Sequence, residues 1–408
     1  MFNKKNIFDY LVSRGLVAQT VFPDELKNLL INEKINFYVG FDPTAESLHI
    51  GHLLILRVAH LLQMCGHKPY LVLGGGTGHI GDPSGRTEMR KMLIPTDINN
   101  YVNAFQKQMQ NFLNFSSENK PIFLNNANWL LDLKWIDLLR CIGQHISVNK
   151  MLSTDAYKTR WERGLSFLEL NYMVMQGYDF LYLNEKYNVV LQLGGSDQWS
   201  NILAGIDLIR RIKQQTAYGL TLTLLTKSDG TKMGKTASGA LWLDPNKTSP
   251  YNFYQYWINV DDEDLKKLFL MLTDLEEEEI DIFVSKTGKD ILEAKHLLAY
   301  LLTKMVHGET AANIAKSESL AAFVNNDVNS MPSISISLKD HSIANLLVET
   351  KLATSKSEAR RLISSNGISI NDSKVTDPLG CLPDDLLSKK TFVIHKGKKQ
   401  HLKIILKD

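Results

Sequence analysis

Apolar residues in the first half of the chain alternate between short continuous runs and longer stretches of helical length. Short runs at 36–42, 68–76 and 188–199 each lead into a loop rich in Gly, Asp or Ser, which indicates strands. Longer stretches at 52–66 and 200–213 have the length of helices. Strands separated by helices predict a parallel sheet, in which ligands bind beyond the carboxyl ends of the strands. We therefore expect the three loops to line one site.

The second half of the chain has other patterns. From 250 to 322 the sequence is strongly charged and helical, without a strand pattern, and 325–340 is polar without a helical period, which predicts a linker. The segment 391–406 reads as a hairpin turning around 396–398. A helix before it should begin at a capping box formed by Ser355 and Glu358.

Gly367 is the expected stop of that helix. Together these patterns predict an α/β fold class with a Rossmann-like parallel-sheet catalytic domain over 1–222. A helical domain over 223–324, a linker over 325–341 and a small α+β domain over 342–408 are expected to follow.

Composition narrows the class of protein. Apolar residues make up 44% of the chain and charged residues 22%, the balance of a globular protein, and no run of 18 apolar residues occurs. The three cysteines, Cys65, Cys141 and Cys381, are far apart, which argues against a disulfide framework and a cysteine-based zinc site. We therefore expect a cytoplasmic protein that does not enter a membrane.

Charge is distributed unevenly along the chain. The whole chain carries a formal charge of +2, but residues 341–408 hold 12 Lys and Arg against seven Asp and Glu. A basic tail on a near-neutral body favours binding of a polyanion at that end. A solvated basic surface explains the charge alone equally well.

Two histidines, His49 and His52, flank Gly51 at the expected start of a helix. A metal site needs a third ligand, and the nearest other histidines, His60 and His67, lie further along the helix and past its end. Capping of the helix is a structural alternative. A helix N-terminus also offers unpaired N–H groups and a positive dipole end, so the imidazoles can donate to phosphate or ribose oxygens.

A second motif supports the phosphate interpretation. The segment "KSDGTKMGKT" (227–236) is an Asp-Gly turn that carries Lys232 and Lys235. A His-x-Gly-His element followed well downstream by a Lys-Met-x-Lys loop resembles the paired signatures of class I aminoacyl-tRNA synthetases. The loop "GGGTGHIGDPSGR" is not a P-loop, because no Gly-Lys-Ser/Thr follows its glycines and Asp82 would repel a phosphate.

An apolar helical segment at 166–183 contains a polar stripe. Tyr172, Gln176 and Asp179 stand at i, i+4 and i+7, so they share one face. Buried polar groups need partners, which an amino acid with a phenol can supply. Asp179 can accept the phenol hydroxyl, while Gln176, Tyr172 and Asp82 can hold the ammonium group; a partly exposed helix is the alternative.

Five segments together resemble the bacterial-type tyrosyl-tRNA synthetases over nearly the whole chain: "YVGFDPTAESLHIGHL", "GGGTGHIGDPSG", "YMVMQGYDF", "LQLGGSDQWSNI" and "KMGKT". The resemblance implies a tyrosine–tRNA ligase that activates L-tyrosine with ATP to tyrosyl-adenylate and pyrophosphate. It then transfers tyrosine to the 3′-terminal ribose of tRNA(Tyr). It also implies Mg²⁺ carried with ATP, a homodimer, and a tail from about 342 similar to an RNA-binding fold of a ribosomal small-subunit protein.

The same resemblance assigns site residues by position. It implies Tyr38 and Asp179 on the substrate phenol, with Asp82, Tyr172 and Gln176 at the ammonium. The implied catalytic groups at the ATP phosphates are Thr44, His49, His52, Lys232, Lys235, Arg86 and Arg90. The implied further ATP-binding positions are Asp42, Gly51, Gly195, Asp197, Gln198 and Met233, and no protein metal site is implied.

Two positions depart from the expected pattern. Gly234 stands where many class I enzymes have serine, so the loop is expected to hold ATP somewhat differently, and His79 replaces an expected methionine.

Three other functions remain open. A tryptophan-specific class I synthetase is the nearest alternative, although an indole offers only a donor N–H group. A non-catalytic RNA-binding relative would be expected to have lost these motifs. A metal-dependent hydrolase would need carboxylate or cysteine ligands beside the histidines, and the sequence does not offer them.

Overall fold

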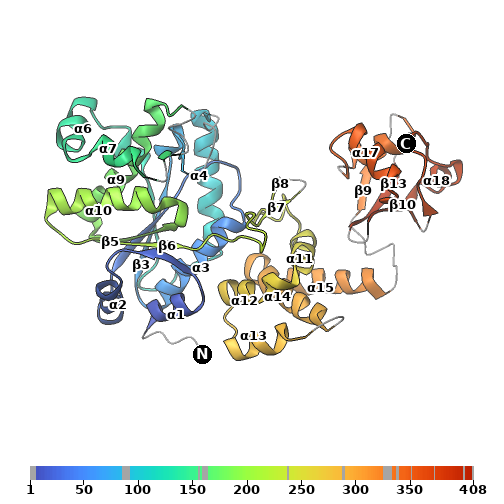
Figure 1. Cartoon of the computed structure of the whole chain (residues 1–408), viewed down its shortest axis with the longest axis horizontal. Coiled ribbons are helices and arrows are strands. Elements are labelled where there is room, and N and C mark those ends of the chain that lie inside the picture. Colours follow the sequence, from blue (N-terminus) through green and yellow to red (C-terminus); the bar gives the residue numbers. More distant parts are fainter. Residues whose placement is uncertain are drawn as a thin grey trace. The chain divides into compact units, whose positions relative to one another are not determined.

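In the computed structural model, the structure describes residues 6–84, 92–154, 157–158, 164–236, 239–286, 290–324, 333–336, 340–350, 352–371, 373–397 and 400–406. The chain forms two compact units. The first comprises Met1–Ser249 and Asp261–Ala294, and the second comprises Pro250–Val260 and Lys295–Asp408. The first unit contains a six-stranded sheet, and the second contains a group of helices and a five-stranded sheet (Figure 1).

A six-stranded sheet organises the first unit, in the order β1-β6-β5-β2-β3-β4. Its strands are β1 (Val17–Thr20), β2 (Asn36–Phe41), β3 (Lys68–Leu73), β4 (Ile122–Asn125), β5 (Val189–Gly195) and β6 (Tyr218–Leu222). All neighbours are parallel except β1 and β6. The chain runs from β2 outward through β3 and β4, then returns to β5 on the other side of β2. The strand order therefore reverses between β2 and β5, where open α/β sheets bind ligands.

The central strands are buried on both faces, as their continuous apolar runs predict. In β3 every residue after Lys68 is buried, and in β5 only Val190 is partly exposed. Helices α9 (Phe167–Tyr187) and α10 (Trp199–Lys213) pack against each other along one face of the sheet (Figure 1). The parallel sheet with crossover helices confirms the predicted fold class.

The other helices of the first unit are mostly short. They are α1 (Ile7–Ser13), α2 (Pro23–Asn32), α3 (Ile50–Met64), α4 (Pro95–Met109), α5 (Ala127–Leu130), α6 (Trp135–Cys141), α7 (Val148–Leu152), α12 (Leu265–Leu272) and α13 (Glu277–Val284). The 3₁₀ turns are η1 (Thr77–His79), η2 (Gly143–His145), η3 (Ser196–Gln198) and η4 (Asp262–Asp264). A two-stranded ribbon joins β7 (Lys235–Thr236) to β8 (Gly239–Ala240).

Two buried arginines attach the segment 261–294 to the sheet unit. Arg14 Nε donates to the carbonyl of Leu270 (2.7 Å), and Arg57 Nε donates to the carbonyl of Met271 (3.1 Å). Both guanidinium groups also donate to the carbonyl of Thr273. These bonds satisfy the open carbonyls at the end of α12, which is why this part of the expected helical segment belongs to the first unit.

The second unit contains helices α11 (Pro250–Ile258) and α15 (Glu309–Val324), most of α14 (Ile291–His307), and the C-terminal α+β domain. The sheet of this domain has the order β11-β10-β12-β13-β9. Its strands are β9 (Ser333–Ile336), β10 (Ile368–Ile370), β11 (Ser373–Lys374), β12 (Thr391–Lys396) and β13 (Gln400–Leu406), and its helices are α16 (Ile343–Glu349), α17 (Lys356–Ser364) and α18 (Asp384–Lys389). The antiparallel pair β12 and β13 confirms the predicted hairpin.

Three local predictions in this domain were wrong in detail. The expected linker contains β9, which pairs in parallel with β13 because the alternating Ser-Ile pattern suits an edge strand. Ser355 caps α17 by accepting the Glu358 N–H (3.2 Å), but the Glu358 carboxylate accepts from the Thr354 N–H (2.8 Å) instead of closing the box. The left-handed residue after α17 is Asn366 (φ 55°), and Gly367 follows it.

Among the helices that the structure describes, none combines the length and the apolar character needed to cross a membrane.

Candidate functional site

A cavity of about 830 Å³ lies in the first unit, at the carboxyl ends of β2 and β5. Most of the residues predicted from sequence line this one cavity: Tyr38, Asp42, Thr44, His49, Gly51, His52, Asp82, Tyr172, Gln176, Asp179, Gly195, Asp197, Gln198, Lys232 and Met233. Arg86 and Arg90, and the side chain of Lys235, lie outside the described residues. The sheet thus brings together side chains that are far apart along the chain.

Helix α9 supplies the polar stripe predicted for one end of the cavity. Its N-terminus is fixed by a capping box in which Ser166 accepts from the Glu169 N–H and Glu169 accepts from the Ser166 N–H. Tyr172, Gln176 and Asp179 then all face the cavity. The helical spacing predicted from sequence therefore positions these three groups.

Asp179 is buried and its carboxylate is held by two donors. Trp129 Nε1 donates to Oδ1 (2.7 Å) and Asn126 Nδ2 donates to Oδ2 (2.9 Å). Burial raises the pKa of Asp179 to about 7, although these two hydrogen bonds favour the charged form. The carboxylate thus has a fixed orientation and changes charge close to neutral pH.

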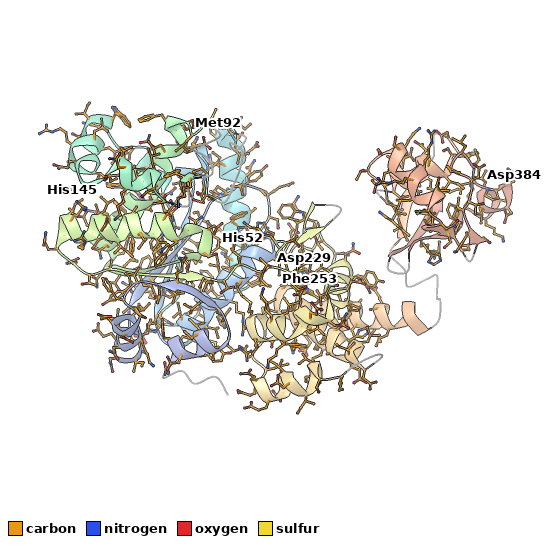
Figure 2. The ribbon with its side chains drawn as sticks, in the orientation of Figure 1. His52, Met92, His145, Asp229, Phe253 and Asp384 are labelled. Atoms are coloured by element: carbon orange, nitrogen blue, oxygen red, sulfur yellow. The ribbon has the colours of Figure 1, made fainter. Side chains whose placement is uncertain are left out.

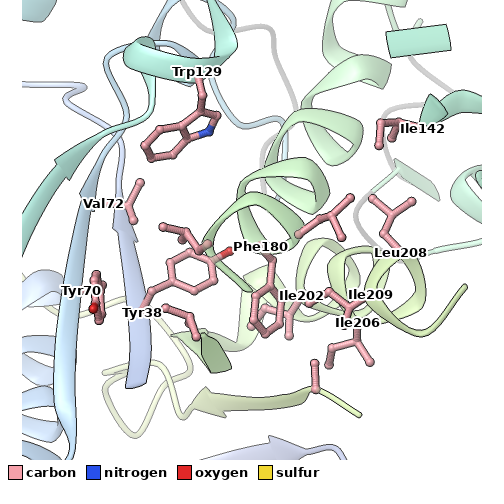
Figure 3. Packing of buried hydrophobic residues seen from close by; sticks show 14 of the residues in the cluster. Tyr38, Tyr70, Val72, Trp129, Ile142, Phe180, Ile202, Ile206, Leu208 and Ile209 are labelled. Carbon is pink, nitrogen blue, oxygen red and sulfur yellow. The ribbon is translucent and has the colours of Figure 1, made fainter. Parts of the chain in front are cut away.

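Tyr38 lies beside this carboxylate in the hydrophobic core. Figure 3 shows its ring next to Phe180. The two ring centroids are 5.3 Å apart, and Val72 and Trp129 belong to the same hydrophobic cluster. Burial, followed by the charge of Asp179, raises the pKa of Tyr38 well above its usual value, so the hydroxyl stays protonated. It is a neutral group that can both donate and accept.

Three buried polar atoms that line the cavity have no hydrogen-bond partner among the described residues. They are the Tyr38 hydroxyl, Gln176 Oε1 and Gln192 Oε1. Buried polar atoms are nearly always paired, because an unpaired one costs about 1–3 kcal/mol. A polar ligand in this part of the cavity would satisfy them. Gln192 was not predicted from sequence, because the apolar run around it indicates only a buried strand.

The predicted ammonium-binding groups are tied to other cavity residues. The Tyr172 hydroxyl donates to Asp42 Oδ2 (2.7 Å). Asp82 Oδ2 accepts from Gln198 Nε2 (2.6 Å), and its Oδ1 accepts from the Ser84 N–H (2.9 Å). In each of these two hydrogen-bonded groups, a residue assigned to the amino acid is therefore linked to a residue assigned to ATP.

Asn126 and Trp129 belong to the hydrogen-bond network of Tyr172 and Asp42, but neither was predicted as a site residue. Asn126 Nδ2 donates to Thr77 Oγ1 (3.0 Å) as well as to Asp179, and Thr77 Oγ1 donates to Asp42 Oδ1 (2.7 Å). A polar "NNAN" segment after a short apolar run was the available signal, since such segments follow strand ends. The run 122–125 was too short to be recognised as a strand.

The glycine-rich loop after β3 allows this network to close. A methyl group at Gly74 would overlap Asp42 Oδ1 and lie 2.6 Å from Thr77 Oγ1. Only glycine leaves room for that hydrogen bond.

The structural interpretation of the two histidines is confirmed, and it leaves Nε2 of each ring for the predicted binding role. His49 is the N-cap of α3: its Nδ1 accepts from the Gly51 N–H (3.1 Å), while His52 Nδ1 accepts from the His49 N–H (3.1 Å). Burial lowers the pKa of His49 and lowers that of His52 well below the usual range, so both rings are neutral at pH 7. Because each Nδ1 accepts a hydrogen bond, each Nε2 carries the proton and can donate.

This donor pair lies at the exposed end of the cavity. Figure 2 labels His52 at the beginning of α3, and the two ring centroids are 4.0 Å apart. Lys232 and Thr44 are both exposed and line the same cavity. This end can therefore bind an anionic group with neutral donors, a cation and the positive end of α3.

The remaining positions predicted to bind ATP follow β5. Gly195 ends the strand, and Asp197 and Gln198 belong to the 3₁₀ turn η3 at the cavity wall. No group of three or more His, Cys, Asp or Glu side chains suited to a metal ion occurs among the residues that the structure describes. The cavity thus combines buried polar groups, exposed donors and carboxylates.

Comparison with known proteins identifies the family. The family model described as tRNA synthetases class I (W and Y) matches residues 30–324, and the Tyrosine--tRNA ligase SYY-like C-terminal domain matches residues 324–404. The tyrosine–tRNA ligase of Malacoplasma penetrans is 52% identical over 408 residues, covering 98% of this chain and 99% of that protein. That of Clostridium tetani is 50% identical over 404 residues, with the same coverage.

Solved structures agree in fold. A C-terminally truncated mitochondrial tyrosyl-tRNA synthetase from Aspergillus nidulans superposes with a TM-score of 0.70 and 27% identity, covering 78% of this chain and 94% of that one. A tryptophanyl-tRNA synthetase from Encephalitozoon cuniculi reaches 0.57 at 12% identity, covering 80% and 92%, and so shares the fold alone. The sequence relatives and the C-terminal domain distinguish the two specificities, and the chain belongs to the tyrosine–tRNA ligase family of class I tRNA synthetases.

Proposed function

We propose that this chain activates tyrosine with ATP in the cavity of its first unit and transfers the tyrosyl group to tRNA(Tyr). The observation that carries the site assignment is that the buried Asp179 carboxylate and three buried polar atoms without a hydrogen-bond partner line the same cavity. A phenol beside Asp179 and the Tyr38 hydroxyl would find both an acceptor and a donor. An ammonium near Gln176, Tyr172 and Asp82 would find oxygen acceptors.

The chemistry needs positioning and charge stabilisation more than proton transfer. The tyrosine carboxylate is already an anion at pH 7 and attacks the α-phosphate of ATP, while pyrophosphate leaves. The Nε2–H groups of His49 and His52 donate to the phosphate oxygens, together with Lys232 and Thr44. Mg²⁺ arrives bound to the ATP phosphates as part of the substrate.

Lys235, Arg86 and Arg90 are proposed to meet the leaving pyrophosphate, as the family resemblance implies. Asp42, Gly195, Asp197 and Gln198 are proposed to bind the nucleotide from the β2 and β5 sides. We also propose a cytoplasmic location, consistent with three unbridged cysteines and with a tRNA substrate.

Amino-acid-dependent exchange of labelled pyrophosphate into ATP, without tRNA, tests the activation step. We expect exchange with tyrosine and none above background with tryptophan or phenylalanine. Exchange with tryptophan would overturn the assignment of Tyr38 and Asp179. No exchange from folded protein would support a non-catalytic RNA-binding function instead.

The C-terminal domain is proposed to bind tRNA through exposed cations on α17. Arg360 and Arg361 are both exposed there. Reversing both charges (R360E/R361E) is expected to weaken tRNA binding by about 10-fold or more and flatten its salt dependence, because phosphate contacts release counterions. Pyrophosphate exchange should not change. The matched control R210E/R211E on α10 carries the same charge change, and an equal loss there would show that only net charge matters.

We propose that the chain forms a homodimer through an apolar patch around α6. The patch consists of Leu131, Trp135, Ile136, Leu139, Val148 and Phe167, each at least 45% exposed. The rings of Trp135 and Phe167 meet edge to face, with centroids 6.2 Å apart. Such a patch on the surface marks an interaction site, and a second copy of the chain is the partner that the family implies.

Sedimentation equilibrium tests the dimer. Ile136→Glu is expected to convert dimers to monomers, because the interface would bury an unpaired charge. Ile282→Glu on α13 is the matched control, since Ile282 is 64% exposed and Ile136 is 62% exposed. A wild-type monomer, or an unchanged dimer in the Ile136 variant, would exclude this interface.

A further inference from the structure

Gly234, which occupies the position of a serine in many class I enzymes, has little freedom in this chain. It is buried, and its φ of +84° lies in the left-handed region that side chains other than glycine rarely adopt. A methyl group there would also overlap Ile50 Cγ2. Gly234 is therefore in direct packing contact with the first residue of α3.

Backbone hydrogen bonds hold this contact from both sides. The Leu241 N–H donates to the Gly234 carbonyl (2.7 Å), and the Leu241 carbonyl accepts from the Ile50 N–H (3.1 Å). On the other side, the Met233 N–H donates to the Leu225 carbonyl (2.8 Å). Gly234 and Ile50 are thus joined through one residue, Leu241, as well as through their direct contact.

The base of the loop is fixed independently. Lys267 on α12 donates from Nζ to both the carbonyl and the Oγ1 of Thr226 (3.0 Å each), and Thr226 pairs with Lys232 in an isolated β-bridge. The loop 226–234 is therefore anchored at Thr226 and at Gly234. Lys232 lies between these anchors, at the mouth of the cavity.

The contact sets the distance between two groups that must act together. Ile50 follows His49 directly and is 1% exposed, and Gly234 lies two residues after Lys232. We propose that Ile50 is a positioning residue: its side chain is the seat for Gly234 and holds Lys232 in register with the His49 and His52 imidazoles on the ATP phosphates. This inference rests on the proposed activation of tyrosine by ATP.

Two glycine-to-alanine variants of the full-length chain test the contact between Gly234 and Ile50. Gly230 has nearly the same φ (+80°), but a methyl group there would meet nothing within 4 Å. Gly230→Ala therefore introduces the backbone strain alone, whereas Gly234→Ala adds the overlap with Ile50. In single-turnover formation of tyrosyl-adenylate, we expect Gly234→Ala to be at least about 10-fold slower than Gly230→Ala, with tyrosine affinity within about twofold in both.

Substitutions at Ile50 test the same contact without a clash. Ile50→Ala removes the seat and is expected to slow adenylate formation by about fivefold to 10-fold, while Ile50→Val, which keeps Cγ2, should stay within about twofold of the unsubstituted chain. Ile50→Ala combined with Gly234→Ala should be faster than Gly234→Ala alone, because the overlap is removed. Thermal unfolding of each variant shows that the assay temperature lies below its transition.

Several outcomes would overturn the proposal. Equal rates for the two alanine variants, no recovery in the double variant, or equal loss of rate and of tyrosine affinity would each exclude a positioning role for Ile50. If the unsubstituted chain shows no tyrosine-dependent exchange, the proposed function fails and this inference fails with it. Normal exchange with equal alanine variants removes the inference alone.

Discussion

Replacing Asp179 by alanine is expected to lower kcat/KM for tyrosine by about 10²-fold or more, with KM for ATP changed less than about twofold. The substitution removes the proposed acceptor for the substrate hydroxyl and leaves Trp129 Nε1–H and an N–H of Asn126 without a partner. Each buried hydrogen bond to a charged group is worth about 1.5–3 kcal/mol. The discrimination between tyrosine and phenylalanine should fall by a similar factor.

Asp179→Asn is the matched control for this substitution. An asparagine keeps the shape and one acceptor oxygen, so it should retain most of the preference for tyrosine over phenylalanine while binding more weakly. Pyrophosphate exchange with both amino acids gives the two kcat/KM values. Unchanged selectivity in the alanine variant would show that Asp179 does not contact the phenol.

The pKa of Asp179 predicts the direction in which kcat/KM for tyrosine changes with pH. Its pKa of about 7 means that Asp179 gains a proton in the unliganded protein as pH falls from 8 to 6, and the neutral acid is a poorer acceptor. We therefore expect kcat/KM for tyrosine to fall across this range on the acid side, and the fall to be absent in Asp179→Asn. Burial lowers the pKa of both His49 and His52, which moves any contribution of these rings to lower pH.

The protonation of Asp179 should also change the free energy of unfolding with pH. Because the folded pKa of Asp179 lies above its unfolded value of 3.8, the folded state binds more protons between about pH 4 and 7. This group therefore makes the fold less stable as pH rises through that window, and its cost is fully present above pH 7.

Local patterns predicted the elements that carry the site better than the contacts between them. Continuous apolar runs were enough for β2, β3 and β5, because strands buried on both faces cannot alternate. Spacing along α9 placed Tyr172, Gln176 and Asp179 on one face. Asn126 and Trp129 cannot be recognised from local patterns, because their partner, Asp179, lies about 50 residues away in sequence and only the fold brings them together.

Some features could not be separated by sequence reasoning at all. The sequence offers capping and ligand binding as alternatives for His49 and His52, yet in the structure Nδ1 of each ring serves the first and Nε2 stays available for the second. Amino-acid specificity is likewise not contained in the fold, since a tryptophanyl-tRNA synthetase superposes on the same sheet. We expect specificity to depend on a few polar atoms, such as the Tyr38 hydroxyl, placed in a common frame.

Alanine at Thr44 or at His49 is expected to lower the rate of tyrosyl-adenylate formation by about 10²-fold, with tyrosine affinity nearly unchanged. Thr44 is exposed and His49 is partly exposed, whereas Asp179 is buried, although all three line the same cavity. A donor that acts on charge developing at the phosphates contributes mainly in the transition state. Single-turnover rates and equilibrium binding of tyrosine separate the two effects. A large loss of tyrosine affinity would place these residues in the wrong part of the cavity.

His49 needs a further control because it also caps α3. Loss of an N-cap costs about 1 kcal/mol of stability, which by itself can disturb the site. Asparagine is a good N-cap but is too short to reach a phosphate that the imidazole Nε2 contacts, so His49→Asn should restore thermal stability without restoring the rate. If His49→Asn restored both, the histidine would act only as a cap, and Thr44, Lys232 and His52 would have to stabilise the phosphates without it.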